Sequence, residues 1–321
     1  MSSTIVCLGV HILDTIAVPI DDVPKLQNSV RVEQILHAAG GTAAGVAVDI
    51  AHLGHPVSTV GVVGADETGR FLLDLMTAKA VDVSAVTTLT AAQTSSSVLL
   101  VDSFGNRPAL HVRGVHAIAE WSDLDLTPLA DADFVHLGGL DALSSLDRSE
   151  AVTLIRELRG RGAYVSLDFQ SSAQHLVPEL LDLVAEVDVF LPNDEQAAGL
   201  TGTSDIDAMS RALLATGVSQ VVITRGADGI HYADAEQTMH IDAFETTVVD
   251  TTGCGDSVVA AYLTALARGH RVQDALTLAS AAGAAVASGV GSLGALPEWE
   301  ELCRSAGIDS QVALSRIEGV K

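Results

Sequence analysis

The residues best suited to chemistry lie in one short stretch, Asp-Thr-Thr-Gly-Cys-Gly-Asp at positions 250–256. An apolar, alanine-rich run follows it and ends near Gly269, which predicts a helix that begins within the stretch. The first turn of a helix carries unpaired backbone N–H groups and the positive end of the helix dipole, and both attract an anion. Gly253 and Gly255 would let the main chain approach that anion without a Cβ atom in the way. The stretch therefore predicts a phosphate-binding turn made by the backbone of Gly253, Cys254 and Gly255.

An acid ends this turn. Asp256 would lie beside the bound phosphate, where its carboxylate could take a proton from a hydroxyl group. That combination suits phosphoryl transfer, because the turn stabilises charge on the moving phosphoryl group while the base frees the attacking oxygen. The competing interpretation of Asp256 is an ordinary helix N-cap. Its position at the end of the complete heptad favours the catalytic base.

The elements that must hold this turn follow an α/β pattern. Residues 245–249 are rich in β-branched side chains and predict a strand leading into the turn. From about residue 121 the chain alternates apolar strands with helices, which predicts a mostly parallel central sheet sandwiched by helices. Strands are expected at 134–139, 164–168, 187–191 and 221–224, and helices at 149–160, 176–185 and 207–216.

A second group of candidate residues lies near the N-terminus. Residues 4–10 predict a buried first strand, and Asp14 follows its end. Ligands of open α/β sheets bind beyond the carboxyl ends of strands, so Asp14 is placed to bind hydroxyls, although a turn aspartate explains it equally well on these residues alone. Gly40 and Gly41 open a helix that runs to Leu53, and they suit either close approach to a ligand or simply the start of a helix.

These motifs resemble the signatures of the ribokinase-like carbohydrate kinases of the phosphofructokinase-B type. The family's Asp-Thr-x-Gly-Ala-Gly-Asp is matched except at Cys254, and its Gly-Gly-x-x-x-Asn-x-Ala is matched except at Gly45. The resemblance implies a single ribokinase-like α/β domain over residues 1–321. A small β lid would be formed by insertions at about 15–38 and 94–115.

The resemblance also implies roles for particular residues. It implies ATP and Mg²⁺ as cofactors, and K⁺ as a monovalent cation held together with carbonyl groups of residues 288–294. The family's Asn-x-x-Glu becomes Asn193 and Gln196 here, where a polar helix start is an equally good interpretation. The implied sets are Asp14, Gly40, Gly41 and Gly45 for the acceptor, Asn193, Gln196, Thr224, Gly226 and Ser280 for the nucleotide, and Asp250 and Thr252 for the monovalent cation.

The composition limits the partners. The formal net charge of −24 argues against a nucleic acid or an acidic membrane surface as a partner. Cys7, Cys254 and Cys303 are odd in number and widely spaced, which favours a reducing, cytoplasmic setting. The N-terminus lacks the basic region of a signal peptide.

Together these features predict an ATP-dependent kinase that phosphorylates an alcohol group of a small sugar-like substrate. Two alternatives stay open: a nucleoside kinase of the same family, favoured by the missing side chain at Gly45, and a catalytically weak sugar-binding sensor, suggested by Gly45 and Gln196. Sugar phosphates are disfavoured as acceptors because basic residues are scarce, although Arg107 and Arg113 in the lid leave them open. The resemblance implies a homodimer formed through the lid.

Overall fold

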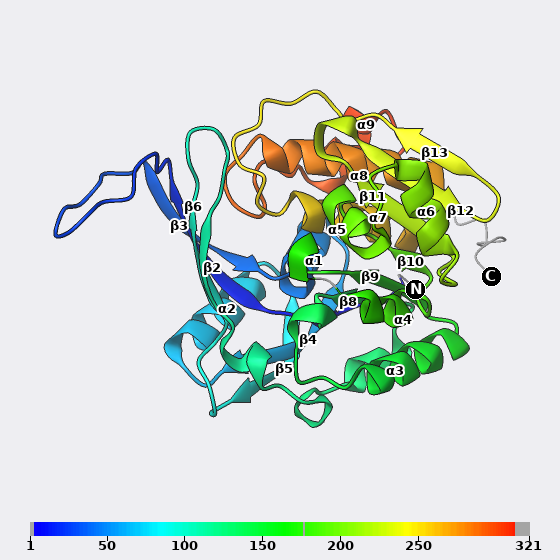
Figure 1. Ribbon diagram of the computed structural model, residues 1–321, viewed down its shortest axis with the longest axis horizontal. Helices are drawn as coiled ribbons and strands as arrows, with labels where there is room; N and C mark the ends of the chain where they lie inside the picture. The colour runs from blue at the N-terminus through cyan, green and yellow to red at the C-terminus, as the bar shows by residue number, and fades with distance from the viewer. Residues whose placement is uncertain (1–2, 176, 312–321) are drawn as a thin grey trace.

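The central feature of the fold is a large sheet, seen in a computed structural model that describes residues 3–175 and 177–311. Within these residues, nine strands form the large sheet in the order β13-β12-β11-β10-β9-β8-β1-β4-β5, and four form a smaller sheet in the order β3-β2-β6-β7. All pairs from β5 to β11 are parallel, and only β12 and β13 pair antiparallel at one edge. The predicted α/β class, with a mostly parallel sheet and a small second sheet, is confirmed (Figure 1). The strands are β1 (Ile5–Gly9), β2 (Ile12–Val18), β3 (Gln34–Gly40), β4 (Val57–Gly64), β5 (Asp82–Leu89), β6 (Ser96–Leu100), β7 (Ala109–Val112), β8 (Phe134–Gly138), β9 (Tyr164–Asp168), β10 (Val189–Phe190), β11 (Gln220–Thr224), β12 (Ile230–Asp234) and β13 (Thr238–Ile241).

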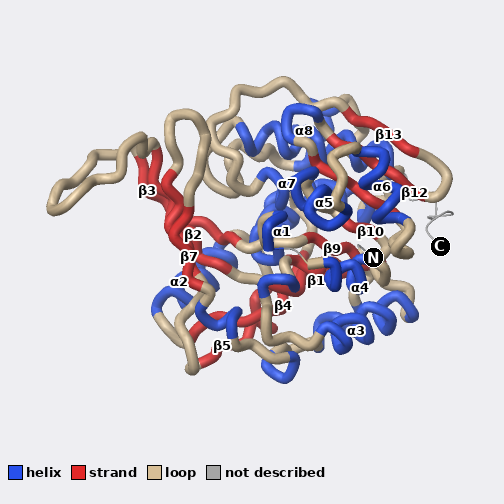
Figure 2. Tube along the Cα trace, viewed as in Figure 1, coloured by secondary structure: helices blue, strands red, loops and turns tan. Residues whose placement is uncertain are grey.

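Helices cover both faces of the large sheet (Figure 2). Successive residues of β1 show this directly: Ile5 and Cys7 belong to one apolar core, and Val6 and Leu8 belong to the core on the opposite face. A strand buried on both faces is expected where helices cross over between parallel strands. No helix in the described ranges is long and apolar enough to cross a membrane. The helices are α1 (Thr42–His52), α2 (Glu67–Ala78), α3 (Arg148–Gly160), α4 (Leu181–Val184), α5 (Asp194–Thr201), α6 (Ile206–Leu214), α7 (Cys254–Ala267), α8 (Val272–Ala287) and α9 (Trp299–Ala306).

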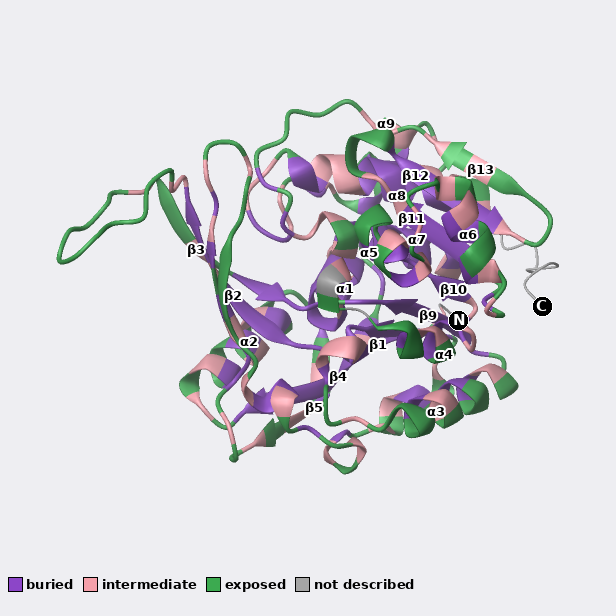
Figure 3. Ribbon diagram, in the orientation of Figure 1, coloured by how far each residue is buried: buried purple, intermediate pink, exposed green. Residues whose placement is uncertain are grey.

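The smaller sheet projects from one side of the molecule and comes from the two segments where the lid is expected. Its two halves join where β2 and β6 pair in parallel, with Asp14 opposite Ser97. Figure 3 shows β2 buried and the far end of β3 exposed. One face of this sheet, including Asp14, Ser97 and Leu99, turns toward the body, and the other carries exposed apolar side chains such as Leu110.

Three predicted elements differ from the structure. Residues 245–249 form no strand, because the chain leaves the sheet edge after β13 and passes over α8, where the N–H groups of Val249 and Asp250 donate to the carbonyl of Ala287. Their β-branched composition therefore does not reflect strand pairing. The helix predicted at 176–185 is reduced to a short 3₁₀ turn (Pro178–Leu180) and α4, with residue 176 outside the described residues. The strand predicted at 187–191 is shorter in the structure, where only the two residues of β10 pair with neighbouring strands.

Candidate active site

The predicted phosphate-binding turn lies at the N-terminus of α7. Gly253 is the N-cap with φ of 79°, and a Cβ atom there would meet the carbonyl oxygen of Ser292 at 2.3 Å, so only glycine fits. The carbonyl of Gly253 accepts from the N–H of Ser257. Among the described residues no backbone carbonyl accepts from the N–H of Gly255 or Asp256, and nothing lies within 4 Å of where a Gly255 Cβ would be. Free N–H groups, open space and the helix dipole therefore coincide here.

A buried carboxylate fixes the shape of this turn. Asp250 is fully buried, and its Oδ1 accepts hydrogen bonds from the backbone N–H of Thr252 (2.9 Å) and from the hydroxyl of Thr252 (2.7 Å). Its Oδ2 accepts from the N–H of Gly291 at 2.9 Å. Asp250 thus ties the turn to the 288–294 loop, the segment expected to supply carbonyl groups to a monovalent cation.

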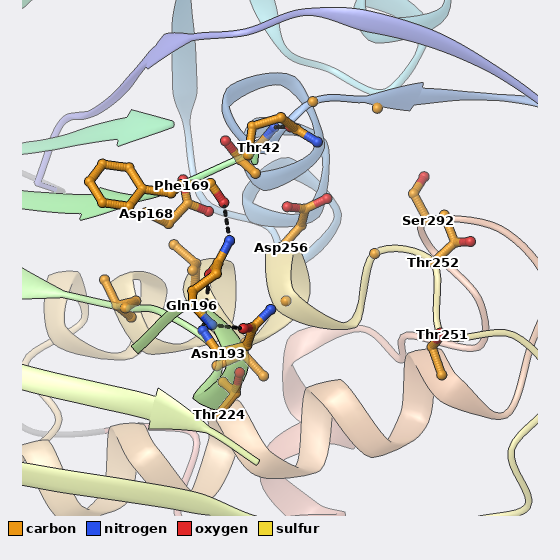
Figure 4. A pocket seen from close by; sticks show the side chains of 18 of the residues that line it. Thr42, Asp168, Phe169, Asn193, Gln196, Thr224, Thr251, Thr252, Asp256 and Ser292 are labelled. Carbon is orange, nitrogen blue, oxygen red and sulfur yellow. Dashed lines mark hydrogen bonds between the residues drawn. The ribbon is translucent and has the colours of Figure 1, made fainter. Parts of the chain in front are cut away.

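Asp256 lies on the first turn of α7, with its carboxylate directed toward α1 (Figure 4). A Cβ atom on Gly45 of α1 would lie only 2.5 Å from Oδ2 of Asp256. Burial raises the pKa of Asp256 to about 7, while nearby Arg107 lowers it and the charge of Asp14 raises it. A carboxylate with this pKa is half ionised near neutral pH, which suits a general base.

A central cavity of about 200 Å³ opens above the turn and gathers residues from distant parts of the chain. Part of its wall comes from the carboxyl ends of β9, β10 and β11, as expected for an open α/β sheet, and part from the α7 turn. The predicted residues that line it are Asp14, Gly40, Gly41, Asn193, Gln196, Thr224, Thr252, Gly253, Gly255 and Asp256.

On one side the central cavity continues into a lid cavity of about 610 Å³, with Asp14, Gly41, Arg107 and Gln170 lining both. The carboxyl group of Asp14 is buried, and a Cβ atom on Gly40 would lie 2.0 Å from its Oδ2, so glycine at this position makes room for the acid. Burial raises the pKa of Asp14 to about 6, against the lowering effects of Ser97 and Arg107.

On the other side lies a helix cavity of about 480 Å³ between α7, α8 and the turn after β11. Thr251 and Val258 line both this cavity and the central one. The helix cavity contains the remaining predicted nucleotide residues, Gly226 and Ser280, together with the side of Cys254. Its walls are mainly small and apolar, which suits a flat heterocycle. The three cavities form a continuous series with Asp256 at its centre.

Asn193 and Gln196 form a reciprocal cap at the start of α5. The N–H of Gln196 donates to Oδ1 of Asn193 (2.7 Å), and Oε1 of Gln196 accepts from the N–H of Asn193 (3.1 Å). The Gln196 amide nitrogen donates to the carbonyls of Phe169 (2.9 Å) and Ser171 (3.0 Å), as Figure 4 shows in part. Gln196 therefore fixes the loop after β9, and its amide N–H groups are already engaged.

Several site residues escaped the sequence analysis. Asp168 ends β9, lines the central cavity, and has a pKa raised well above normal, first by burial and then by the charge of Asp256. The rule that ligands bind beyond the carboxyl ends of strands, which drew attention to Asp14, applies to Asp168 as well. Gln170 accepts a hydrogen bond from the N–H of Thr42 and so ties this loop to the start of α1, a contact with no local sequence signal.

A further acid lies beneath the site. Asp49 is one turn beyond Gly45 on α1, is 1% exposed, and has no hydrogen-bond partner for either carboxyl oxygen among the described residues. Burial, then the charge of Asp256, raises its pKa well above normal. Burial therefore favours the uncharged form of Asp49, whereas the pKa of Asp256, beside the turn, lies near neutrality.

The α/β fold, the glycine turn at the start of α7 and the acid beside it are the features expected of a phosphotransferase that acts on alcohols. The family model described as "pfkB family carbohydrate kinase" matches residues 2–299, and the chain belongs to this family; it is a carbohydrate kinase. It is 30% identical to a fructokinase of Klebsiella pneumoniae over 85% of this chain and 93% of that protein.

Solved structures with lower identity support the fold. The ribokinase of Arabidopsis thaliana, solved with ribose and ATP, superposes with a TM-score of 0.82 at 23% identity, covering 96% of this chain and all of that one (100%). A structure from Escherichia coli described as a putative ribokinase II in complex with ATP and Mg²⁺ gives a TM-score of 0.82 at 22% identity, covering 95% of this chain and 98% of that one.

Proposed function

We propose that this protein transfers the γ-phosphoryl group of ATP to an alcohol group of a small sugar or sugar derivative held in the lid cavity. One observation carries the proposal: Asp256 and the free N–H groups of the α7 turn share the central cavity, which continues into the lid cavity. An acceptor hydroxyl beside Asp256 would face the phosphoryl group in line, with the base and the anion site within one turn of helix.

Each residue has a part in this reaction. Asp256 takes the hydroxyl proton, and the N–H groups of residues 253–255 bind the transferring phosphoryl group. For this the N–H of Cys254 would exchange its long contact with the carbonyl of Thr251 (3.4 Å) for the phosphoryl group. Asp14 and the Gly40–Gly41 turn hold the acceptor. Thr224, Gly226 and Ser280 contact the nucleotide, whose base occupies the helix cavity.

The residues of the central cavity fit magnesium. Oδ1 of Asp168 is buried without a hydrogen-bond partner among the described residues, and hard divalent cations prefer oxygen ligands. Asp168 and Asn193 would hold the ion beside the phosphates, where it neutralises their charge. A K⁺ ion would be held at the 288–294 loop beside Asp250 and Thr252. The proposal also includes a cytoplasmic location and a homodimer formed through the lid.

The environment of Gly45 weakens the nucleoside alternative, because the space left by its missing side chain is taken by the Asp256 carboxylate. The lid cavity is also lined by no Phe, Tyr or Trp from the described residues, so a base would find only the smaller imidazole rings of His111 and His175 to stack on. The contact between Gly45 and the Asp256 carboxylate also explains why this chain has glycine where the family signature has asparagine. Glycine at this position therefore does not imply a loss of catalysis, which weighs against a sugar-binding sensor.

The test is a coupled ADP-release assay with purified protein, Mg²⁺ and ATP over sugars, sugar derivatives and nucleosides. The proposal expects acceptor-dependent ADP release with a sugar-type substrate. Turnover only with nucleosides, or binding of sugars without any turnover, would replace it with one of the two alternatives.

A further inference from the structure

The wall of the lid cavity gathers four basic side chains, beside the acids Asp14 and Asp141. The chain has 17 lysine and arginine residues against 41 acids, yet Arg107, Arg113, His111 and His175 all line this one cavity. Arg107 also lines the central cavity and lowers the pKa of both Asp14 and Asp256, so it belongs to the reacting end. The other three, which we call the distal cluster, line the lid cavity and not the central one.

Strand geometry explains how the lid directs these side chains inward. In the pairing of β6 with β7, His111 lies opposite Ser97 and Ala109 opposite Leu99, and all four line the cavity. Arg113 follows the end of β7, at the start of a 3₁₀ turn (Gly114–Ala117), and lines the same cavity. The opposite wall comes from the loops after β8 and β9, which carry His175.

The positive charge of this cluster comes mainly from Arg113. In the described part of the chain Arg113 forms no ion pair with a carboxylate; its Nη2 donates to the carbonyl of Ala142 at 2.7 Å. Asp141 lines the same cavity, but its two oxygens already accept from the N–H groups of Gln170 and Ser171, both at 2.9 Å. Partial burial and the nearby charge of Arg113 lower the pKa of His111.

Resting on the proposed kinase function, we propose that the acceptor is an anionic sugar, a sugar acid or a sugar phosphate, whose charged group binds the distal cluster while its hydroxyl faces Asp256. The planar guanidinium of Arg113 suits bidentate binding of a carboxylate or phosphate. The imidazoles of His111 and His175 add N–H donors on either side. This reverses the expectation that scarce basic residues disfavour charged acceptors, because the scarce residues gather where the acceptor binds.

The first test compares kcat/KM for neutral sugars (D-fructose, D-ribose), sugar acids (2-ketogluconate, 2-keto-3-deoxygluconate) and sugar phosphates (fructose 1-phosphate, fructose 6-phosphate). We expect the preferred substrate to be anionic. Comparison of the sugar acids with the sugar phosphates shows whether the site prefers a carboxylate or a phosphate. For that substrate, Arg113→Ala should lower kcat/KM about 30-fold or more, mainly through KM, as when one partner of a hydrogen-bonded charge pair is removed. Residual turnover of neutral sugars, which carry no charged group for Arg113 to bind, should fall far less.

The matched control is Arg31→Ala, which removes the same charge from an exposed position of the lid loop that lines neither cavity. Its kinetics should equal those of the wild type. Preference for a neutral sugar with no effect of Arg113→Ala would overturn the anion proposal and leave the kinase function standing. If no compound is turned over, the kinase proposal fails, and thermal-shift titration with the same panel decides the anion site separately. Stabilisation by anionic sugars that Arg113→Ala abolishes supports the site, and its absence overturns it.

Discussion

Gly45 of α1 and Asp256 of α7 are in direct contact: a Cβ atom on Gly45 would lie 2.5 Å from Oδ2 and 3.0 Å from Cγ of Asp256. The family signature has asparagine at position 45, so this chain has lost a side chain where its proposed catalytic base now rests. The two helices pack closely, and the carboxylate occupies the space that a side chain would need. Gly45 therefore sets the position of Asp256.

Gly45→Ala should lower kcat by roughly 10- to 100-fold, because a displaced base no longer lines up with the acceptor hydroxyl. Replacing a helical glycine with alanine should otherwise stabilise the helix by up to about 1 kcal/mol, so the loss of activity should occur without unfolding. Steady-state kinetics and urea unfolding test both effects. Gly160→Ala is the matched control, since nothing lies within 4 Å of a Cβ there. Unchanged turnover in Gly45→Ala would mean that the contact does not position the base.

Asp256→Asn should lower kcat roughly 10²- to 10⁴-fold, the usual contribution of a general base. The amide keeps the size of the side chain and the N–H groups of the turn, so ATP affinity measured by calorimetry should change by only a few fold. Asp131→Asn, at an exposed position, is the control and should behave as the wild type. Wild-type turnover in Asp256→Asn would leave Asp256 as an ordinary residue of the first helical turn.

The activity should depend on pH through Asp256. A base must be ionised to accept a proton, so with a pKa of about 7 the value of kcat/KM should rise with pH through neutrality and level off above it. Because Arg107 lowers this pKa, Arg107→Ala should move the rise to higher pH, whereas Arg31→Ala should not. A pH profile that is flat from 5 to 8 contradicts the assignment.

Much of this site could be predicted from the sequence because its signals are local. The heptad at 250–256 specifies a glycine turn, a helix start and an acid within seven positions. Asp14 lines the central cavity, although it lies within β2 of the small sheet and not at the exit of the first strand. The reason for Gly45 could not be predicted, because it depends on how closely α1 packs on α7, some two hundred positions apart in the chain. The strand predicted at 245–249 failed for the same reason, since only a neighbouring strand could have paired with it.

The lid arginines show a different limit. The small number of basic residues in the sequence predicted that charged acceptors are disfavoured. Which basic side chains face the substrate depends instead on the alternation of side chains along β7 and on the fold of the lid. Asp168 was missed although it ends a correctly predicted strand, because nothing in its local sequence marks it as different from any acid at the end of a strand.

Asp49→Asn should stabilise the protein increasingly as pH rises. The folded-state pKa of Asp49 is raised, so between pH 4 and the folded value the folded state keeps a proton that the unfolded state has lost, and stability falls as pH rises through that window. Asparagine removes this dependence. Urea unfolding should give a measurable gain in the free energy of unfolding at pH 8 and little gain at pH 4. Asp74→Asn on the exposed side of α2 is the control, and an equal effect at both pH values would show that Asp49 is not a buried neutral acid.

Cys254 should contribute its backbone and not its thiol. Burial raises the pKa of this thiol to about 11, so it is not a thiolate near neutral pH, and the family signature has alanine at this position. Cys254→Ala should therefore keep kcat within about threefold, and the wild type should lose little activity to iodoacetamide at pH 7.5. Because the side chain lines the helix cavity with Gly226 and Ser280, the bulkier Cys254→Leu should raise KM for ATP about tenfold while KM for the acceptor stays unchanged. A rise in the acceptor KM instead would place the nucleotide elsewhere.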